Sequence, residues 1–412
     1  MHVYHRVRSL KTQDRLGWSV LAALIASAAL GGCESRQMAA DPGKPEATTA
    51  AAPATDESSP QMIAEGQHTF RFDTFGDEQF WTDTLHLNEV VEKAVDPTTA
   101  LKVGLKVDAD ALPPGILKTV DLKSPATTIA LLKMNAVVGL QGTVDANNHL
   151  VRLGVTCALC HSTVDNSVMP GIGHRRDGWP NRDLDVGAII ALSPAVTADQ
   201  KKVYSAWGPG KYDPRYNIDG KNTPLAIPPA YGLAQVKNET YTAEGPISYW
   251  NAYVAVTQMH AHGNFADTRL GIDTKQEPDM VTSKLPALRA YQHSLLAPAP
   301  PAGSFETAAA DRGHALFDHS CSSCHTGSTG TDNNDGKLHP ASDTGMDGAY
   351  AARTANKAYR TTPLRGLWQH PPYFHDGSAA NLADVVTHYD KIRSLGLTAK
   401  QQQDLVEYLK SL

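Results

Sequence analysis

Two cysteine motifs supply the residue types and the spacing for a specific chemistry. One is Cys157–His161, which reads Cys-Ala-Leu-Cys-His, and the other is Cys321–His325, which reads Cys-Ser-Ser-Cys-His. In such motifs the two thiols form thioethers to the vinyl groups of haem, and the adjacent histidine binds the iron axially. One helical turn places both sulfurs on the same haem edge. The pattern predicts two haem c groups, attached at Cys157, Cys160, Cys321 and Cys324 and bound axially by His161 and His325.

Other uses of paired cysteines account for less of the pattern. Zinc is bound by paired Cys-x-x-Cys motifs, but these two pairs lie far apart in the chain and each is followed by histidine. A redox Cys-x-x-Cys motif needs no such histidine, and two local disulfides leave both histidines unexplained. Because the chain has only five cysteines, two chance matches to the full motif are not expected, and the haem interpretation is favoured.

Composition sets the class of protein. The chain has 412 residues, enough for two or three domains, and a formal net charge of −6, so no basic field indicates a nucleic acid partner. Charged residues make up only 19% of the chain, which also contains 32 glycines and 26 prolines. This balance is typical of a loop-rich protein that wraps around large apolar cofactors.

The first residues predict export and a lipid anchor. Four basic residues precede the apolar segment Leu16–Leu30, which is short for a membrane span. It leads into Leu30–Cys33 (Leu-Gly-Gly-Cys), which resembles a bacterial lipobox, so Cys33 is expected to carry lipid; an ordinary signal peptide with a chance cysteine is the alternative. Export agrees with haem attachment in an oxidising compartment. We expect a membrane-anchored lipoprotein on the periplasmic face, with a signal peptide at 1–32 and a disordered Ala- and Pro-rich tether at 33–65.

The segment after the first motif offers a second axial ligand for the first iron. Glycines at 171 and 173 let the backbone approach a flat cofactor, and His174 follows them. His174 is therefore a candidate for the far side of the iron, the alternative being a loop histidine bonded to backbone. Rival ligands lie at and beyond the end of a predicted helix over Ile247–His260: Met259, His260 and His262.

Basic residues near the motifs are candidates for pairing with the haem propionates, because a guanidinium binds a carboxylate through two hydrogen bonds. They are Arg175, Arg176, Arg182 and Arg365. Residues Thr143–Val151 predict a hairpin that leads toward the first motif. The Pro-rich stretch 297–303 reads as a stiff linker and a domain boundary.

The last hundred or so residues resemble the small cytochrome c fold. A predicted helix over Phe305–Ser320 carries Gly313 and Phe317 one turn apart and enters the second motif, and Thr398–Gln401 predicts a capping box that starts a last amphipathic helix. In that fold the two terminal helices cross, with glycine at their closest approach. We therefore predict a mainly α fold with two cytochrome c-like haem domains, 66–296 and 304–412, the first enlarged by loop-rich insertions. The polar turn Asp332–Gly336 makes calcium conceivable, although its spacing does not fit an EF-hand.

A more specific resemblance rests on Thr362–Leu367 and Pro372–Ser378, followed by Leu382–Tyr389. These segments resemble the C-terminal half of bacterial di-haem cytochrome c peroxidases and the related methylamine-utilisation enzyme MauG. The resemblance implies that the distal ligand of the second haem falls on Tyr389, with His388 and Met346 as rivals. It also implies that Gly173–His174 matches the Gly-His distal ligand of the first haem, which leaves the iron on activation.

The first region departs from this family at one motif. The Trp-Asp-Gly segment of the peroxidases is missing from residues 66–300. Candidate replacements for its tryptophan are Trp179, Trp207 and Trp250, and the nearest acidic candidates are Glu239 and Glu244. The catalytic residues are therefore left unassigned.

Function follows from whether the first iron keeps its distal ligand. A haem with two protein ligands shuttles single electrons, and a haem with a releasable ligand can bind peroxide or oxygen. We expect a periplasmic di-haem electron-transfer oxidoreductase of the peroxidase type, in which electrons enter at the second haem from a small cytochrome or cupredoxin and hydrogen peroxide is reduced at the first. A non-catalytic electron relay is the alternative, and an oxygen-activating di-haem oxygenase ranks last.

Overall fold

The computed structural model describes residues 59–412, which lie within one compact unit, Thr55–Leu412. The predicted signal peptide, the lipid-bearing Cys33 and most of the predicted tether lie outside the described residues. Among the described residues, none forms a helix long and apolar enough to cross a membrane.

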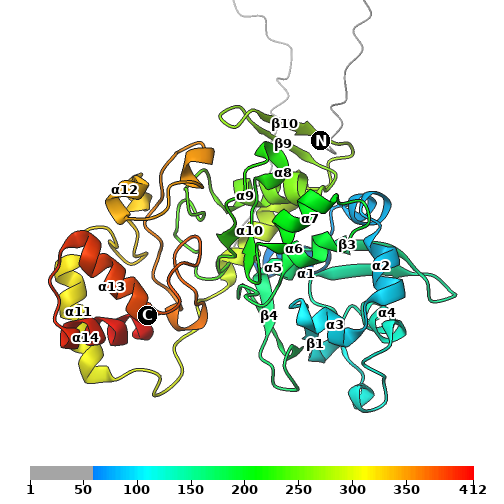
Figure 1. The fold of residues 1–412 in the computed structure, drawn as a ribbon, viewed down its shortest axis with the longest axis horizontal. Helices are drawn as coiled ribbons and strands as arrows, with labels where there is room; N and C mark the ends of the chain where they lie inside the picture. The colour runs from blue at the N-terminus through cyan, green and yellow to red at the C-terminus, as the bar shows by residue number, and fades with distance from the viewer. Residues whose placement is uncertain (1–58) are drawn as a thin grey trace, which may run out of the picture. The chain divides into compact units, whose positions relative to one another are not determined.

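Helices dominate the described residues, with short strands between them (Figure 1). The α-helices are α1 (Pro60–Phe72), α2 (Leu87–Ala94), α3 (Pro97–Lys102), α4 (Pro125–Lys133), α5 (Ala158–His161), α6 (Val186–Ala191), α7 (Ala198–Ser205), α8 (Tyr216–Asp219), α9 (Ile247–Val254), α10 (Leu285–Ser294), α11 (Thr307–Ser320), α12 (Ala341–Thr344), α13 (Leu382–Arg393) and α14 (Ala399–Ser411). Two wider turns are π-helical: η1 (Gln79–Thr84) and η4 (Ala255–Met259).

The strands of the described residues form five two-stranded sheets rather than one large sheet. The hairpin predicted around Thr143–Val151 is confirmed as β2 (Leu140–Val144) paired antiparallel with β3 (Leu150–Val155). The other pairs are β1 (Val107–Asp108) with β5 (Ile172–Gly173), β4 (Ser162–Val164) with β6 (Arg175–Asp177), β7 (Lys211–Tyr212) with β8 (Leu225–Ala226), and β9 (Asn264–Asp267) with β10 (Ile272–Lys275).

The boundary predicted at residue 65 between tether and domain is wrong, because α1 begins at Pro60. Ser59 caps this helix by accepting a hydrogen bond from the Met62 amide, and proline suits its first turn. Gly66 then lets α1 lie against α10, since a Cβ at Gly66 would fall 1.9 Å from the carbonyl oxygen of Ala287. A composition rich in alanine and proline concealed this helix start.

Buried side chains gather into separate clusters along the chain. The largest cluster and its neighbour draw on residues 70–291, whereas a third is built from 317–409. A fourth small cluster joins Leu225 to Tyr350, Ala351 and Tyr359. Since 55–412 is one compact unit, the division into domains at 66–296 and 304–412 stays a prediction that this distribution of core residues favours.

The C-terminal helices confirm the predicted elements. α11 matches the helix predicted over Phe305–Ser320, and α14 starts with the predicted capping box of Thr398 and Gln401. α11 and α14 lie side by side near α13 (Figure 1), and a Cβ at Gly313 would fall 2.0 Å from the carbonyl oxygen of Asp404. Arg312 on α11 also pairs with Asp404 at 2.8 Å. Glycine is therefore needed where these two helices meet.

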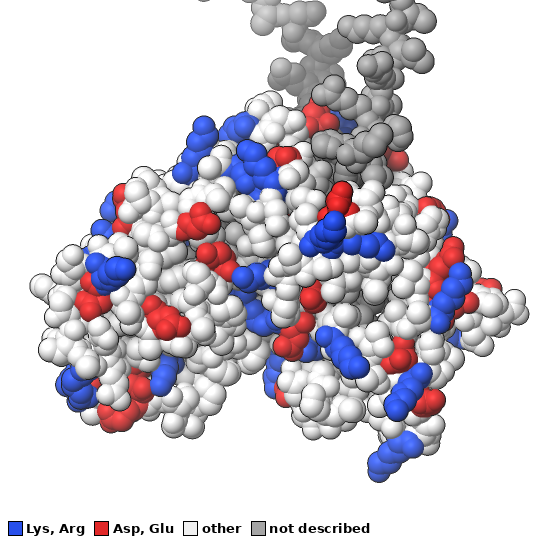
Figure 2. Space-filling model, viewed as in Figure 1, with Lys and Arg blue, Asp and Glu red and all other residues white. Residues whose placement is uncertain are grey.

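Charges on the visible face are mixed in sign (Figure 2). Basic and acidic side chains alternate there, in keeping with the modest net charge of −6. Such a surface gives no strong single-sign field for long-range steering.

Candidate functional site

The first motif sits on the short helix α5 at the end of the β2–β3 hairpin. Gly139 makes this placement possible, because its φ is +80°, in the left-handed region, and a Cβ there would lie 2.2 Å from the Cα of Leu159. The Thr156 amide donates to the Gly139 carbonyl at 3.0 Å and holds the start of the motif against the hairpin. The hairpin thus fixes the turn that carries Cys157 and Cys160.

The structure forms no disulfide within either cysteine pair of the motifs. Burial raises the pKa of both Cys157 and Cys160 to about 12 and that of Cys321 to about 11. Cys157 and Cys160 pack against the main core.

The two motif histidines are held in the same way. Nδ1 of His161 lies 3.1 Å from the carbonyl oxygen of Pro228, and Nδ1 of His325 lies 3.1 Å from that of Gly330. Each carbonyl accepts a hydrogen bond from Nδ1–H, which leaves the lone pair of Nε2 free to bind a metal. Burial lowers the pKa of His325 and lowers that of His161 to about 4, so both rings are neutral at pH 7.

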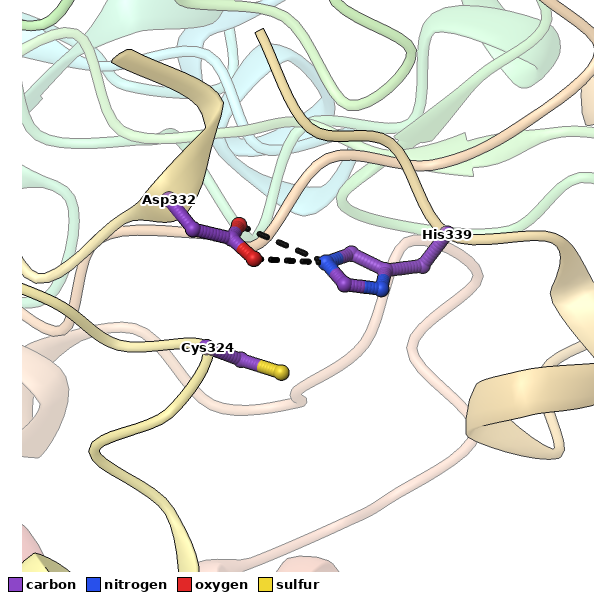
Figure 3. Close-up of side chains that lie close together, drawn as sticks. All are labelled: Cys324, Asp332 and His339. Atoms are coloured by element: carbon purple, nitrogen blue, oxygen red, sulfur yellow. Dashed lines mark hydrogen bonds and ion pairs between the residues drawn. The ribbon is translucent and has the colours of Figure 1, made fainter. Parts of the chain in front are cut away.

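A zinc site shared by the two cysteine pairs does not form. Among the described residues, the group that could hold a metal is Cys324, Asp332 and His339, which contains one motif cysteine only (Figure 3). Nε2 of His339 lies 3.0 Å and 3.3 Å from the two oxygens of buried Asp332. This contact also occupies the carboxylate at the head of the predicted calcium turn Asp332–Gly336, so calcium stays a prediction that this geometry does not favour.

His174, the leading candidate for the far side of the first iron, lies at the surface. Its Nδ1 is 2.8 Å from Oδ1 of Asp110, and more than half of each of these two side chains is exposed. The structure therefore does not bring its ring together with the first motif.

The rival residues lie deeper. Met259 is buried in the main core, and its carbonyl accepts from the Trp81 indole at 3.2 Å. His260 ends the π-helical turn η4 in a left-handed conformation, with its ring stacked 3.7 Å from that of Phe80. Burial lowers the pKa of His260 to about 4, so it is a neutral imidazole. His262 faces Gln79 at the surface.

The three candidate distal ligands around the second motif differ in their surroundings. Burial raises the pKa of Tyr389 to about 12, and the charges of Cys324 and Cys321 also act on its hydroxyl, so Tyr389 lies close to the motif. The adjacent His388 is engaged elsewhere, with Nε2 2.7 Å from the Thr344 carbonyl. Met346 packs against the small cluster of Tyr350 and Tyr359. The geometry thus favours Tyr389 among the three.

The four arginines predicted to pair with propionates differ in their partners. Arg175 pairs with Asp108 at 3.0 Å, and exposed Arg176 pairs with Asp165 at 3.3 Å. Arg365 donates to backbone carbonyls, including those of Gly232 and Ser328. One nitrogen of Arg175, Nη1, is buried without a hydrogen-bond partner, whereas Arg182 has two such nitrogens, Nε and Nη1, and no carboxylate partner. A buried guanidinium with two unpaired nitrogens beside the first motif suits a carboxylate-bearing cofactor, so the residues present fit haem.

The candidate replacements for the tryptophan and the acidic residue of the Trp-Asp-Gly segment also differ in their contacts. Trp179 packs edge-to-face on Trp368 with ring centroids 5.7 Å apart, whereas Trp250 stacks on Tyr253 and Trp207 donates to Asn222. Glu244 is buried and pairs with Arg215 at 2.6 Å. Glu239 is buried too, but only its Oε1 has a partner, His293 at 3.2 Å.

Sequence reasoning missed two residues of this neighbourhood. Arg360 donates to the carbonyls of Glu239 and Thr240, and burial lowers its pKa to about 10. His370 lies beside Arg182, which donates to its carbonyl at 3.0 Å, and burial lowers the pKa of the His370 ring to about 4. The sequence places Arg360 two residues before the segment Thr362–Leu367, but nothing local signals that the side chain of Arg360 or of His370 is buried.

Comparison with known proteins identifies the C-terminal part. Residues 310–412 match the cytochrome c family and form a cytochrome c domain. The Cys-x-x-Cys-His motif within these residues is Cys321–His325, so this domain has the attachment motif and the axial histidine of a haem c site. Among curated proteins, none matches the sequence.

Two solved structures resemble parts of the chain at 21% identity. Hydrazine synthase of Kuenenia stuttgartiensis aligns with a TM-score of 0.34 over 46% of this chain and 73% of its own. A MauG-like protein associated with microbial copper homeostasis aligns with a TM-score of 0.27 over 34% of this chain and 62% of its own. Likenesses at this level carry no argument about what the chain does.

Proposed function

We propose that this chain is a di-haem c-type cytochrome of the peroxidase type, with a second haem c at Cys157–His161. The observation that supports a haem at Cys157–His161 is the matched arrangement of the two motif histidines. His161 and His325 each present Nδ1 to a backbone carbonyl at 3.1 Å and keep Nε2 free. A histidine that serves only as a core residue has no reason to copy this arrangement beside a Cys-x-x-Cys pair.

The two sites are proposed to divide the work. Haem c supplies one-electron redox chemistry, together with a binding position for peroxide where one axial position is free. Tyr389 lies close to the second motif and suits a fully ligated, electron-accepting site. His174 is at the surface, so the first site is the one proposed to admit hydrogen peroxide.

Reduction of one hydrogen peroxide to two waters consumes two electrons and two protons. A small periplasmic cytochrome or cupredoxin is proposed as the electron donor. A buried acidic side chain is proposed to transfer protons to the peroxide oxygens. Glu239 is the candidate, because its Oε2 is buried without a partner, whereas Glu244 is held by Arg215. Export and a lipid anchor at Cys33 complete the proposal, which places the domain at the periplasmic face of a membrane.

A second candidate function is an electron relay with both irons fully ligated. The observation that favours it is His260, a buried, neutral imidazole at the end of η4. If His260 or Met259 binds the first iron permanently, peroxide has no position to bind.

Electron paramagnetic resonance and optical spectra of the oxidised and half-reduced protein separate the two functions. A high-spin signal that cyanide converts to low spin, together with peroxide turnover, supports the peroxidase. Two low-spin haems inert to cyanide and peroxide at every redox level refute it and support the relay.

Variants identify the ligand in either case. His174→Ala is expected to leave the spectrum of the first haem unchanged, because His174 pairs with Asp110 at the surface. A shift in that variant would instead show that His174 reaches the iron in the loaded protein. In the relay, His260→Ala or Met259→Ala converts the first haem to high spin.

A further inference from the structure

A cluster of orphaned polar atoms lies beside the first motif. In the described part of the chain, Arg182 Nε and Nη1, Arg360 Nη1, Glu239 Oε2 and Thr240 Oγ1 are sealed from solvent and lack hydrogen-bond partners. We call these four residues the Arg182–Arg360 cluster. Buried polar groups are nearly always paired, so several orphans in one place call for a partner of matching chemistry.

Hydrogen bonds join Arg360 to two of these residues, and a charge interaction with Tyr241 places Arg182 in the same neighbourhood. Nε of Arg360 donates to the Thr240 carbonyl at 2.6 Å, and Nη2 donates to the Glu239 carbonyl at 3.1 Å. Burial raises the pKa of the next residue, Tyr241, and the charges of both Arg182 and Arg360 oppose that rise. Both guanidinium groups therefore lie around the segment 239–241.

The cluster has an excess of positive charge on its Arg182 side. Burial lowers the pKa of Arg182, and the groups whose charges oppose this are the hydroxyls of Tyr241, Tyr231 and Tyr373 rather than any carboxylate. Those hydroxyls donate to the carbonyls of other residues. Glu239 acts on Arg360, while Asp376, a carboxylate that acts on Tyr241, accepts a hydrogen bond from the Ser378 amide. A buried guanidinium without a carboxylate is costly unless an anion binds there.

The position of the cluster identifies the anion. The residue before Arg182, Asn181, donates its amide to the Cys160 carbonyl at 2.9 Å, and the charge of Arg182 acts on His161. Arg360 stands two residues before Thr362, whose backbone acts on His325. The cluster is thus adjacent to the first motif and is completed by a residue from the cytochrome c domain.

We infer that Arg182 and Arg360 together bind a propionate carboxylate of the haem at Cys157–His161, so that the cytochrome c domain contributes Arg360 to the first haem site. Arg182 Nε and Nη1 and Arg360 Nη1 offer three donors, and a carboxylate accepts several hydrogen bonds through its two oxygens. This inference rests on the first haem of the proposed function but not on the reaction at that haem. A free inorganic anion offers the same oxygen chemistry, and the test separates the two.

The test measures the reduction potential of each haem by spectroelectrochemistry in the full-length, two-haem protein. Loss of a cation that pairs with a propionate stabilises the oxidised iron, so Arg182→Gln and Arg360→Gln should each lower the potential of the first haem. The effect of the double variant should differ from the sum of the single effects, because both residues bind one group. Arg360→Lys keeps the charge and should restore most of the potential.

Arg176→Gln is the matched control, since Arg176 also lies near the first motif but is exposed and paired with Asp165. Its shift should be smaller than either test shift. Haem content is determined first, so a chain that lacks haem at Cys157–His161 would refute the proposed function at that motif rather than the assignment of Arg182 and Arg360.

Three outcomes would overturn the inference. An unchanged first-haem potential in both Gln variants would mean that water satisfies the cluster. Shifts in different haems for Arg182→Gln and Arg360→Gln would mean that the two residues do not share a carboxylate. Stabilisation of the loaded protein by inorganic phosphate, lost in Arg182→Gln, would mean that a free anion is bound there.

Discussion

The region 59–296 and the cytochrome c domain 310–412 place the same five-residue motif in different surroundings. In the C-terminal domain the motif follows α11 directly, and Nδ1 of His325 reaches the carbonyl of Gly330, five residues further on. In the first region the motif follows a hairpin, and Nδ1 of His161 reaches Pro228, 67 residues away. The second site is therefore assembled locally, whereas the first depends on distant segments.

This difference extends to the charged groups. The orphaned cluster beside the first motif includes Arg360 from outside the first region. By contrast, Asp332 and His339 beside the second motif lie close to it in sequence. Loss of long-range packing is thus expected to damage the first site before the second.

Loss of a cysteine pair should have the largest effect. Cys157→Ala with Cys160→Ala should remove the first haem and Cys321→Ala with Cys324→Ala the second, leaving one haem per chain in each case. Haem content per chain by the pyridine haemochrome assay measures this. Ser322→Ala is the control within the motif, since the Ser322 hydroxyl donates to the Asp318 carbonyl. Unchanged haem content in either double variant would contradict covalent attachment at that pair.

Glycines at one close backbone approach in each region should have the next largest effect. Gly313→Ala should destabilise the α11–α14 packing by about 1–3 kcal/mol, because its Cβ would fall 2.0 Å from the Asp404 carbonyl oxygen. Gly139→Ala should cost at least as much, because its φ of +80° adds backbone strain to the clash with Leu159. Urea unfolding measures both free energies.

Gly348→Ala provides the comparison for these glycines. Its added Cβ would meet only the Cβ of Ala341, at 3.2 Å, so a small change is expected. If Gly313→Ala costs no more than Gly348→Ala, the close helix contact that is characteristic of the C-terminal domain is not required for its stability.

Local assembly also decides what the sequence could predict. The helix that enters the second motif, the capping box at Thr398 and the hairpin before the first motif all depend on neighbours in the chain, and all three are confirmed. The helix predicted over Ile247–His260 is only partly right, because α9 ends at Val254 and the π-helical turn η4 carries the chain to Met259. Periodicity alone cannot distinguish an α-helix from a wider turn of similar composition.

In the candidate site, too, features that depend on chain neighbours were predictable from the sequence, and features that depend on distant residues were not. Both motifs and the candidate Tyr389 were accessible from spacing and resemblance. The surface position of His174 was not, because it depends on Asp110, which lies 64 residues earlier in the chain. Arg360 was also missed, since an arginine in a loop gives no sign of burial before its distant neighbours are known.

Substitution of the candidate distal residue should change the second haem without loss of the fold. Tyr389→Phe should alter the optical spectrum and potential of the second haem only, because the hydroxyl is the atom that could reach the iron. His388→Ala should leave that spectrum unchanged, because His388 Nε2 is engaged by the Thr344 carbonyl. A spectral change in His388→Ala alone would transfer the ligand role to His388 and weaken the resemblance to MauG.

The smallest expected effect is a pH dependence specific to the C-terminal helices. Hydrogen bonds from Arg312 and then Lys400 lower the pKa of Asp404 to about 2, below the ordinary value of about 3.9 for an unfolded aspartate. A lowered pKa in the folded protein stabilises the fold above the unfolded value, and this contribution is lost as the pH falls from about 4 to about 2. Asp404→Asn should therefore be less stable than the unmodified protein at pH 7, and the two free energies of unfolding should converge as the pH approaches 2.

Asp311→Asn, which removes a charge from the exposed face of α11 without breaking this ion pair, is the control for net charge. A difference between Asp404→Asn and the unmodified protein that stays constant from pH 7 to pH 2 would show that the Arg312–Asp404 pair does not stabilise the contact between α11 and α14, and that Gly313 and the apolar side chains hold the two helices together.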